Sequence, residues 1–273
     1  MLPVDIVLLR HGQSEGNKAH RASEEGDNRF FTPEFRDKHS RNFRLTDLGI
    51  RQAKTAGEWL KQNVPMPLDR FYVSDYIRAK ETAVYLDLSG AEWKDEIGLR
   101  ERDLALMDNL PDDEKKHLFE LEVRQHEIDP FFSYPAGGSE SVAALIFRVK
   151  TDLVAHLARE CSDKRVMIVC HGHVMRALQF LFEKLSHDDF IRLDSSKEPA
   201  DKLRNCQVIW YTRRDPETGK IAGDKLVAVR SVCPLVCPSN KVEDWGWRRI
   251  QRRRHTNQEL LEEVNRYPRH VND

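Results

Sequence analysis

The sequence predicts an α/β fold: a three-layer α/β/α sandwich whose central sheet is mostly parallel and has an antiparallel edge. Short apolar runs at residues 4–10 and 165–170 alternate with longer amphipathic stretches, as in parallel sheets covered by helices on both faces. Two further runs, residues 207–212 and 225–232, flank a turn that contains proline and glycine. This pattern is typical of an antiparallel hairpin, which we place at the edge of the sheet.

The other elements follow from hydrophobic periodicity and capping residues. Residues 46–63 are expected to form a helix, because Thr46 is suited to the N-cap and leucines and alanines recur on one helical face. Pro65 and Pro67 end this helix. Further strands are expected at 70–74 and 92–97, and further helices at 76–88, 112–127, 139–160 and 174–185.

Length, charge and cysteine content narrow the class of protein. A chain of 273 residues with a net charge of -1 can build a sizeable core and gives no global sign of nucleic-acid or membrane binding. The five cysteines lack the spacing of a disulfide framework, which indicates a reducing compartment. The N-terminus is unlike a signal peptide, and no apolar stretch reaches the ~20 residues of a membrane span. We therefore expect a cytoplasmic protein without a membrane span or a nucleic-acid partner.

Two segments stand outside the regular pattern, and they set the expected domain organisation. Residues 1–240 would form one domain in which the arginine-containing connection 18–44 caps a pocket. Residues 241–273 would form a basic C-terminal tail with Trp245, Trp247 and five arginines between 248 and 254. We expect the tail to pack its tryptophans on the domain and leave its arginines in solvent. The alternative is that the tail binds an anion or an acidic partner.

Residues 8–17, which read LLRHGQSEGN, carry the strongest chemical signal in the chain. A buried strand ends in Arg10 and His11, and Gly12 lets the backbone approach a ligand closely. Arg10 supplies a permanent cation whose planar fork suits phosphate oxygens. A histidine held among fixed cations can attack phosphorus. The segment predicts phosphoryl transfer through a phosphohistidine.

A second strand-His-Gly corner occurs at His171, where residues 165–170 run into Gly172 and the start of a helix. The N-terminus of a helix offers free N–H groups and a positive potential, which suit an anion. Two such corners in one parallel sheet place both histidines at the crevice outside the carboxyl ends of the strands. Arg78 stands in the first turn of another helix that follows a strand.

These segments resemble the histidine phosphatase superfamily in its phosphoglycerate-mutase-like branch (branch 1). Its signature is matched by RHGQSEGN at 10–17, LTDLG at 45–49 followed by Gln52 and Ala53, SDYIRAKETA at 74–83, LRERD at 99–103 and GSES at 138–141. The resemblance extends in the family's order over about residues 4–235. It implies a phosphoglycerate-mutase-like sandwich.

The resemblance also implies a role for each matched residue. His11 would be the nucleophile, and Glu101 would be the acid for the leaving oxygen and then the base for water, with Asp103 as a competing candidate. The phosphoryl group would be held by Arg10, Asn17, Arg78, His171, Gly172 and His173. Because arginines neutralise the charge, no metal or cofactor is implied. The partner would be a small phosphorylated metabolite, and the hairpin edge is a candidate surface for pairing two copies.

Phosphatase and mutase activity are distinguished by residues after the acid. Cofactor-dependent phosphoglycerate mutases tend to have His-Tyr-Gly there and a pair of arginines further on, whereas Glu101 is followed by Arg-Asp-Leu-Ala and residues 111–135 hold no such pair. These departures favour a phosphatase for small phosphomonoesters, with the mutase as the alternative. Glu140, expected in the first turn of its helix, could contact His171 or substrate hydroxyls, which is left open.

Overall fold

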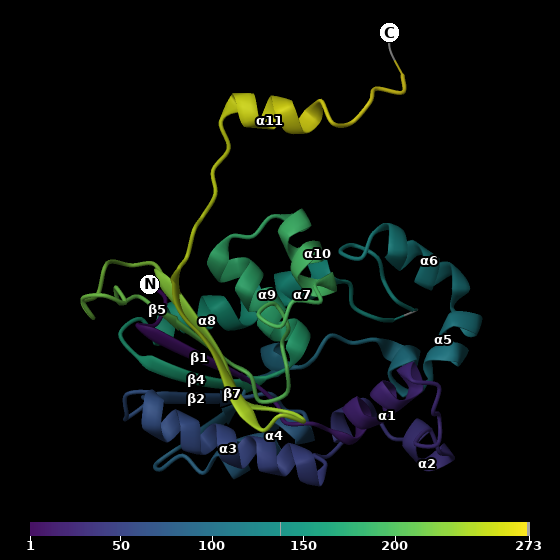
Figure 1. The fold of residues 1–273 in the computed structure, drawn as a ribbon, viewed down its shortest axis with the longest axis horizontal. Helices are drawn as coiled ribbons and strands as arrows, with labels where there is room; N and C mark the ends of the chain where they lie inside the picture. The colour runs from purple at the N-terminus through teal and green to yellow at the C-terminus, as the bar shows by residue number, and fades with distance from the viewer. Residues whose placement is uncertain (137, 272–273) are drawn as a thin grey trace.

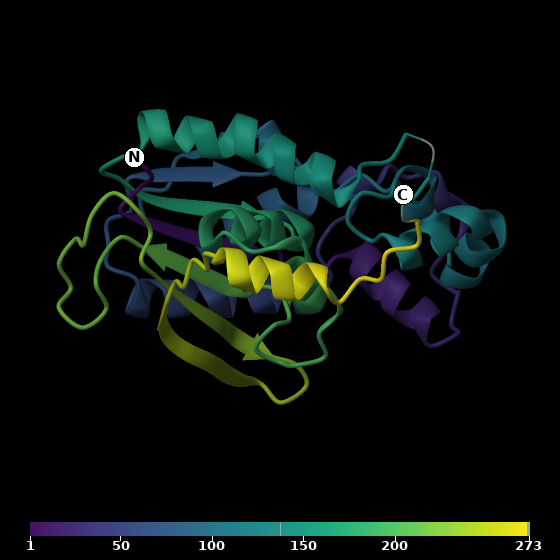
Figure 2. The same cartoon turned by 90° about the horizontal axis from the view of Figure 1, so that it is seen from above.

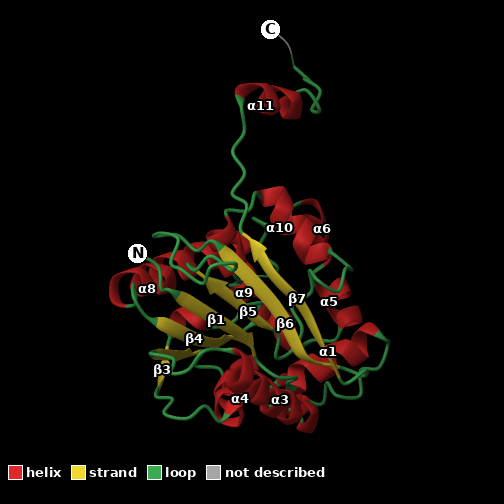
Figure 3. Cartoon of the chain, turned by 60° about the vertical axis from the view of Figure 1, so that its left-hand side comes forward, coloured by secondary structure: helices red, strands yellow, loops and turns green. Residues whose placement is uncertain are grey.

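The computed structural model describes residues 1–136 and 138–271, and it confirms the predicted α/β sandwich. Its sheet has seven strands in the order β3-β2-β4-β1-β5-β6-β7. β1 (Asp5–Arg10), β2 (Arg70–Val73), β3 (Trp93–Asp95) and β4 (Arg165–Cys170) are parallel. β5 (Val208–Thr212), β6 (Ala228–Val236) and β7 (Lys241–Arg249) pair antiparallel, as the strands in Figure 3 show.

Helices cover both faces of the sheet (Figure 1). α3 (Asp47–Asn63) and α4 (Ile77–Leu86) pack on one face, and α7 (Val142–Arg148), α8 (Ala155–Glu160) and α9 (Gly172–Glu183) on the other. Alternation along β1 explains the two apolar layers. Ile6 and Leu8 belong to the layer with α7–α9, while Val7 and Leu9 belong to the layer with α3 and α4.

Local capping accounts for where the helices begin and end. Thr46 caps α3 as predicted, because its hydroxyl accepts the amide of Gly49 at 3.1 Å. α7 begins at Val142, three residues later than predicted, because the hydroxyl of Ser141 accepts the amide of Ala144. α7 continues through a π-helical stretch, Val149–Val154, into α8 as one long rod (Figure 2).

The helix expected at 112–127 is divided into α5 (Asp112–Leu118) and α6 (Glu120–Ile128). Phe119 leaves the helical region between them, with φ -125° and ψ 41°. α4 ends at Leu86 because Asp87 takes a left-handed conformation with φ 49°. α9 begins at Gly172, two residues earlier than expected, with His171 at its N-cap.

Several regular elements were missed in the sequence. The connection at 18–44 contains most of α1 (Glu15–Glu24), α2 (Pro33–Arg36) and a short 3-10 turn, Ser40–Asn42. α10 (His187–Ser195) and α11 (Asn257–Val264) were also not predicted. Within the described residues, no helix combines the length and the apolar character needed to cross a bilayer.

The hairpin of β5 and β6 is present, but it does not form the edge of the sheet. Residues 241–249, which the sequence analysis placed in the tail, form β7 and pair with β6. Trp247 packs edge-to-face on Trp210 of β5, with 4.8 Å between the ring centroids. This aromatic contact attaches the start of the predicted tail to the sheet.

Candidate functional site

The two predicted histidine corners meet because β1 and β4 are neighbours in the sheet. Arg10 is in register with Cys170, so His11 and His171 leave the carboxyl ends of the two strands side by side. Their ring centroids are 5.1 Å apart, and both side chains are buried. This is the crevice in which α/β sheets bind ligands.

The ring of His11 is oriented by its own loop. Nδ1 lies 2.7 Å from the carbonyl oxygen of Gly12, so it donates to that oxygen and Nε2 is left as the unprotonated nitrogen. Burial, and then the charges of Arg78, His171 and Arg10, hold the pKa of His11 well below its usual value. The imidazole is therefore neutral at physiological pH, which a nucleophile requires.

Two guanidinium groups, the buried one of Arg78 and the half-buried one of Arg10, lie beside the ring. Nε of Arg78 donates to Nε2 of His11 over 3.1 Å, and its Nη1 donates to the carbonyl of Ser40. Arg10 donates to the carbonyl of Leu203, and its Nε is buried with no hydrogen-bond partner among the described residues. Burial lowers the pKa of both arginines, although they remain charged. Buried cations that bind neutral carbonyls form a site with strong affinity for an anion.

His171 offers a further polar atom to the same crevice. Its Nε2 lies 2.8 Å from the hydroxyl of Ser74, and its Nδ1 is buried without a partner in the described part of the chain. Burial and the charge of Arg78 hold its pKa well below the usual value. The amides of Gly172 and His173 belong to the first turn of α9, where N–H groups are free for a ligand.

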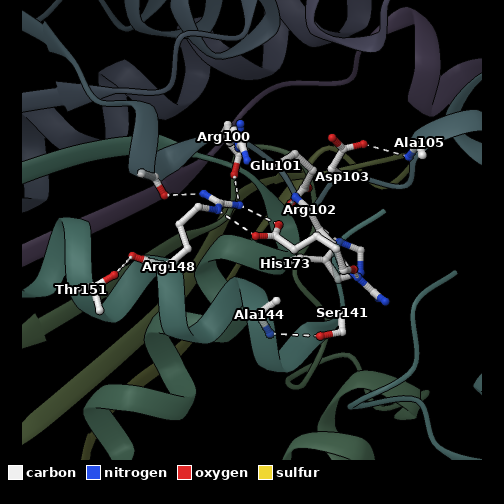
Figure 4. Close-up of polar contacts among 12 residues, drawn as sticks. Arg100, Glu101, Arg102, Asp103, Ala105, Ser141, Ala144, Arg148, Thr151 and His173 are labelled. Carbon is white, nitrogen blue, oxygen red and sulfur yellow. Dashed lines mark hydrogen bonds and ion pairs between the residues drawn. The ribbon is translucent and has the colours of Figure 1, made fainter. Parts of the chain in front are cut away.

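Glu101 is the carboxylate beside these cations. Its Oε1 accepts the amide of Arg102 at 2.9 Å and lies 3.7 Å from Nδ1 of His173 (Figure 4). Burial by itself raises the pKa of Glu101, but the hydrogen bond and charge of His173, the charge of His171 and the Arg102 amide outweigh it. The pKa of Glu101 consequently lies well below its usual range.

Asp103 was the competing candidate for the acid, but its side chain forms a hydrogen bond within its own loop. Its carboxylate accepts the amide of Ala105 at 2.8 Å, and it does not line the cavity that contains His11. Ala105 takes a left-handed conformation with φ 49°. A left-handed alanine costs roughly 1 kcal/mol relative to glycine, and the Asp103 hydrogen bond stabilises this turn (Figure 4).

Asn17 lies in the crevice together with a residue that the sequence analysis missed. The amide nitrogen of Asn205 donates to the carbonyl of His11 and to Oδ1 of Asn17, both at 3.0 Å. Oδ1 of Asn17 also accepts the amide of Ser14, which leaves the Asn17 amide nitrogen available as a donor. Asn205 precedes Cys206, which has φ 55°. No motif marks Asn205, because its contact with His11 spans 194 positions in sequence.

A cavity of about 600 Å³ opens above these groups. Its lining includes the predicted site residues Arg10, His11, Asn17, Arg78, Glu101, Gly172 and His173. The other charged side chains of the lining have both signs: four cations (Arg102, Lys115, Arg176 and Lys202) and four carboxylates (Glu24, Asp108, Asp112 and Asp194). Lys115 is itself paired with Asp112 at 3.2 Å. The charges of these eight side chains therefore nearly cancel.

The connection at 18–44 lines this cavity without its arginines. His20, Glu24, Ser40 and Phe43 face the cavity, whereas none of the arginines within residues 18–44, all of which the structure describes, is part of its wall. Arg36 forms a bidentate pair with Glu114, and Arg44 pairs with Glu81. Arg36 and Arg44 thus hold α5 and α4 and do not contact the cavity.

Glu140 is committed to an ion pair. Nε and Nη2 of Arg148 each donate to its carboxylate at 2.8 Å, and this arginine also binds the carbonyl of Gly98. Glu140 precedes α7 and its N-cap, so the expectation that it stands in the first helical turn is wrong. Figure 4 shows Arg148 reaching from α7 toward the loop that carries Glu101. Through Arg148, Glu140 therefore supports the loop that carries Glu101.

The start of the predicted tail packs on the domain through Trp247 as expected, but Arg248, Arg249 and Arg252 bind groups of the domain, contrary to the expectation that the arginines lie in solvent. Arg248 pairs with buried Glu183 at 2.6 Å, and Arg249 pairs with Asp215 at 2.7 Å. Arg252 donates to the carbonyls of Phe182 and Leu226.

In the described part of the chain, no cluster of three or more His, Cys, Asp or Glu side chains is arranged to hold a metal ion.

Comparison with known proteins identifies the family. The sequence profile of the histidine phosphatase superfamily (branch 1) matches residues 6–203. The 2,3-bisphosphoglycerate-dependent phosphoglycerate mutase of Methylorubrum populi is 31% identical over 186 residues, which cover 66% of this chain and 80% of the relative. The enzyme of that name from Parvibaculum lavamentivorans is 30% identical over 198 residues, with coverage of 71% and 86%.

Solved structures of the same fold include phosphatases. A mycobacterial glucosyl-3-phosphoglycerate phosphatase superposes with a TM-score of 0.57 at 23% identity, covering 76% of this chain and 89% of that one. A phosphoserine phosphatase of Entamoeba histolytica has a TM-score of 0.55 at 17% identity, covering 81% and 96%. Together with the paired histidine corners, the profile match shows that the chain belongs to branch 1 of the histidine phosphatase superfamily, whose members are phosphatases or mutases.

Proposed function

We propose that this protein is a metal-independent phosphatase that hydrolyses small phosphomonoesters through a phosphohistidine on His11. The observation that carries the proposal is the state of the His11 ring: Nδ1 is committed to Gly12, and Nε2 faces the buried guanidinium of Arg78. A phosphoryl group bound between Arg10, Arg78 and His171 would present phosphorus to this nitrogen. The fixed cations would stabilise the charge that develops on the equatorial oxygens.

The reaction would take place in two displacements. In the first, the lone pair of Nε2 forms a bond to phosphorus, the bond to the ester oxygen breaks, and Glu101 donates a proton to the leaving alkoxide. In the second, the Glu101 carboxylate removes a proton from water as the water oxygen attacks phosphorus, and the P–N bond breaks to release phosphate. Arg10 and Arg78 hold the phosphoryl oxygens throughout.

The balanced charges of the other lining residues support a phosphatase over a mutase. A mutase must retain a bisphosphorylated sugar acid while phosphate returns to its other oxygen, which needs strong cationic contacts at the second phosphate. The mixed charges around Lys115 and Asp112 give no such excess of positive charge. The 600 Å³ cavity would accommodate a phosphomonoester whose remaining groups are polar or uncharged.

The decisive experiment is release of inorganic phosphate from p-nitrophenyl phosphate and a panel of phosphorylated metabolites, in the presence of a metal chelator. We expect wild-type turnover and complete loss in His11→Ala, with His117→Ala as the control because His117 is an exposed residue of α5. An acid-labile, base-stable phosphoryl adduct should form on the wild type and be absent from His11→Ala. Wild-type protein that releases no phosphate from any compound would refute the phosphatase.

Mutase activity is the second candidate, because the relatives at about 30% identity carry that name. It is tested by conversion of 3-phosphoglycerate to 2-phosphoglycerate in the presence of 2,3-bisphosphoglycerate. We expect phosphate release to exceed isomerisation. Isomerisation that is faster than release would assign the mutase instead.

A further inference from the structure

α11 is a complete helix whose apolar side lies in solvent. Thr256 caps it through reciprocal hydrogen bonds with Glu259. Leu260, Leu261 and Val264 are 46%, 53% and 62% exposed. An isolated helix of eight residues is not stable in water. α11 must therefore gain stability from contact with another surface.

The connector to α11 leads away from the rest of the chain. The amide of Ile250 bonds to the carbonyl of Val227, and Arg252 donates to the carbonyls of Phe182 and Leu226. Beyond Arg252 the chain extends into solvent, and α11 stands apart from the domain (Figures 1 and 3). Among the described residues, no hydrogen bond or ion pair joins α11 to any residue before Arg253.

A second cavity of about 990 Å³ lies between α9, α10 and the strands β5–β7. We call it the arginine cavity, because seven arginines and only three carboxylates line it. Its apolar lining includes Leu193, Leu203, Val229 and Trp245. Arg192, Arg253 and Arg254 are among its arginines. The cavity is thus apolar in part and positively charged.

α11 complements this cavity in both respects. Within Asn257–Val264 it carries three glutamates (Glu259, Glu262 and Glu263) and no basic residue. Its leucines and valine match the apolar lining, and its glutamates match the arginines. Burying these apolar side chains would supply most of the affinity, while opposite charges would select the orientation.

We propose that α11 of one copy of this chain docks in the arginine cavity of a second copy, so that two copies exchange their C-terminal helices. Arg253 and Arg254 both line the cavity and are followed by only two residues, 255 and 256, before α11. The α11 of the same chain would therefore have to reverse direction within those two residues to enter the cavity. A second copy meets no such constraint. A two-fold exchange buries both helices in equivalent contacts and closes the assembly at a dimer. The proposed interface does not depend on the proposed phosphatase activity.

Analytical ultracentrifugation of the full chain over a range of concentrations tests the dimer. We expect a particle of twice 31.9 kDa whose dissociation constant rises with salt concentration. Leu260→Glu with Leu261→Glu should weaken the dimer at least about 100-fold, because two apolar side chains lose their burial. Gln258→Ala, a change to an exposed residue of the same helix, is the matched control and should leave the dimer intact.

Mixing two variants tests whether α11 docks in the arginine cavity. A cavity variant, Arg253→Glu with Arg254→Glu, and the helix variant should each be weakened by themselves. Their equimolar mixture should form a heterodimer, because the intact helix of one meets the intact cavity of the other. A mixture that stays monomeric would exclude this cavity as the docking site. Wild-type protein that is monomeric at every concentration would overturn the exchange. Thermal melting curves would verify that each variant is folded.

Discussion

The Nε atom of Arg78 lies 3.1 Å from Nε2 of His11, and both side chains are buried at the carboxyl end of the sheet. The first turn of α4 therefore delivers a permanent cation to the ring nitrogen that is free to react. A phosphoryl group on that nitrogen would be contacted by the guanidinium fork without rearrangement of the backbone. The relationship makes Arg78 the residue whose geometry is most directly testable.

Arg78→Lys keeps the charge but removes the planar fork and the contact through Nε. We expect kcat for phosphate release to fall by about 10²–10³-fold, the usual loss for a preorganised transition-state donor, with a smaller change in KM. Arg159→Lys, at an exposed position of α8, is the control. Equal rates for Arg78→Lys and wild type would show that charge alone is sufficient.

Glu101→Gln should separate the two displacements. p-Nitrophenolate leaves without a proton, so the variant should give a burst of about one nitrophenolate per site followed by slow turnover, because water lacks its base. An alkyl phosphate needs the acid and should give no burst. Stopped-flow absorbance measures the first case, and quenched-flow analysis of the alcohol measures the second. Bursts of equal size with both esters would contradict an acid role.

The pH dependence of catalysis follows from the direction of the Glu101 shift. The pKa of Glu101 lies below its usual range, so the protonated form that acts as acid is scarce at pH 7 and becomes more abundant as the pH falls. We expect kcat for an alkyl phosphate to rise from pH 7 toward pH 5, while the first step with p-nitrophenyl phosphate changes less. A rate for the alkyl ester that falls toward acid pH would contradict this assignment.

His20 should make folding stability depend on pH. Burial, and then the charge of Lys115, lower the pKa of His20 to about 4. The unfolded state therefore binds more protons between about pH 6.5 and 4, and the stabilising contribution, present above pH 6.5, is lost as the pH falls. It amounts to about 3 kcal/mol when complete.

The test compares urea unfolding of wild type and His20→Gln at pH 7 and pH 4. Relative to that of His20→Gln, the free energy of unfolding of wild type should be lower by about 3 kcal/mol at pH 4 than at pH 7. The other histidines with a lowered pKa, His11, His126 and His171, are common to both proteins, so their contributions cancel. A pH-independent difference would show that folding does not lower the pKa of His20.

Alanine substitutions at two glycines of α3 separate an effect on folding stability from an effect on the geometry of the site. A Cβ on Gly49 would lie 2.1 Å from the carbonyl oxygen of Gln13, in the loop that follows His11, and one on Gly57 would lie 2.2 Å from the carbonyl oxygen of Leu86. Either alanine should destabilise the fold by roughly 1–3 kcal/mol through overpacking. Only Gly49→Ala should also lower kcat per folded molecule, because it displaces the His11 loop. Equal activity losses in both variants would indicate a global effect.

The sequence could predict elements and residues whose signals are local. A buried apolar strand that runs into His-Gly can be recognised from neighbouring residues alone. β1, β4 and the two histidines were therefore predictable from hydrophobic pattern and motif. Thr46 was predictable as a cap for the same reason. Asn205 was not, because its contacts with His11 and Asn17 join segments far apart in the chain. The ion pair between Glu140 and Arg148 was not predictable either, since it depends on where the loop that carries Glu101 passes α7.

The chain by itself determined the layer order of the fold, the two histidine corners and the family, because periodicity and motif spacing are properties of neighbouring residues. Only the tertiary structure decided which charges are free and which are paired. It directed Arg36 and Arg44 to glutamates outside the cavity, added β7 to the sheet through Trp247 and left α11 in solvent. Those outcomes depend on distances between segments that meet only after folding, and no local pattern encodes them.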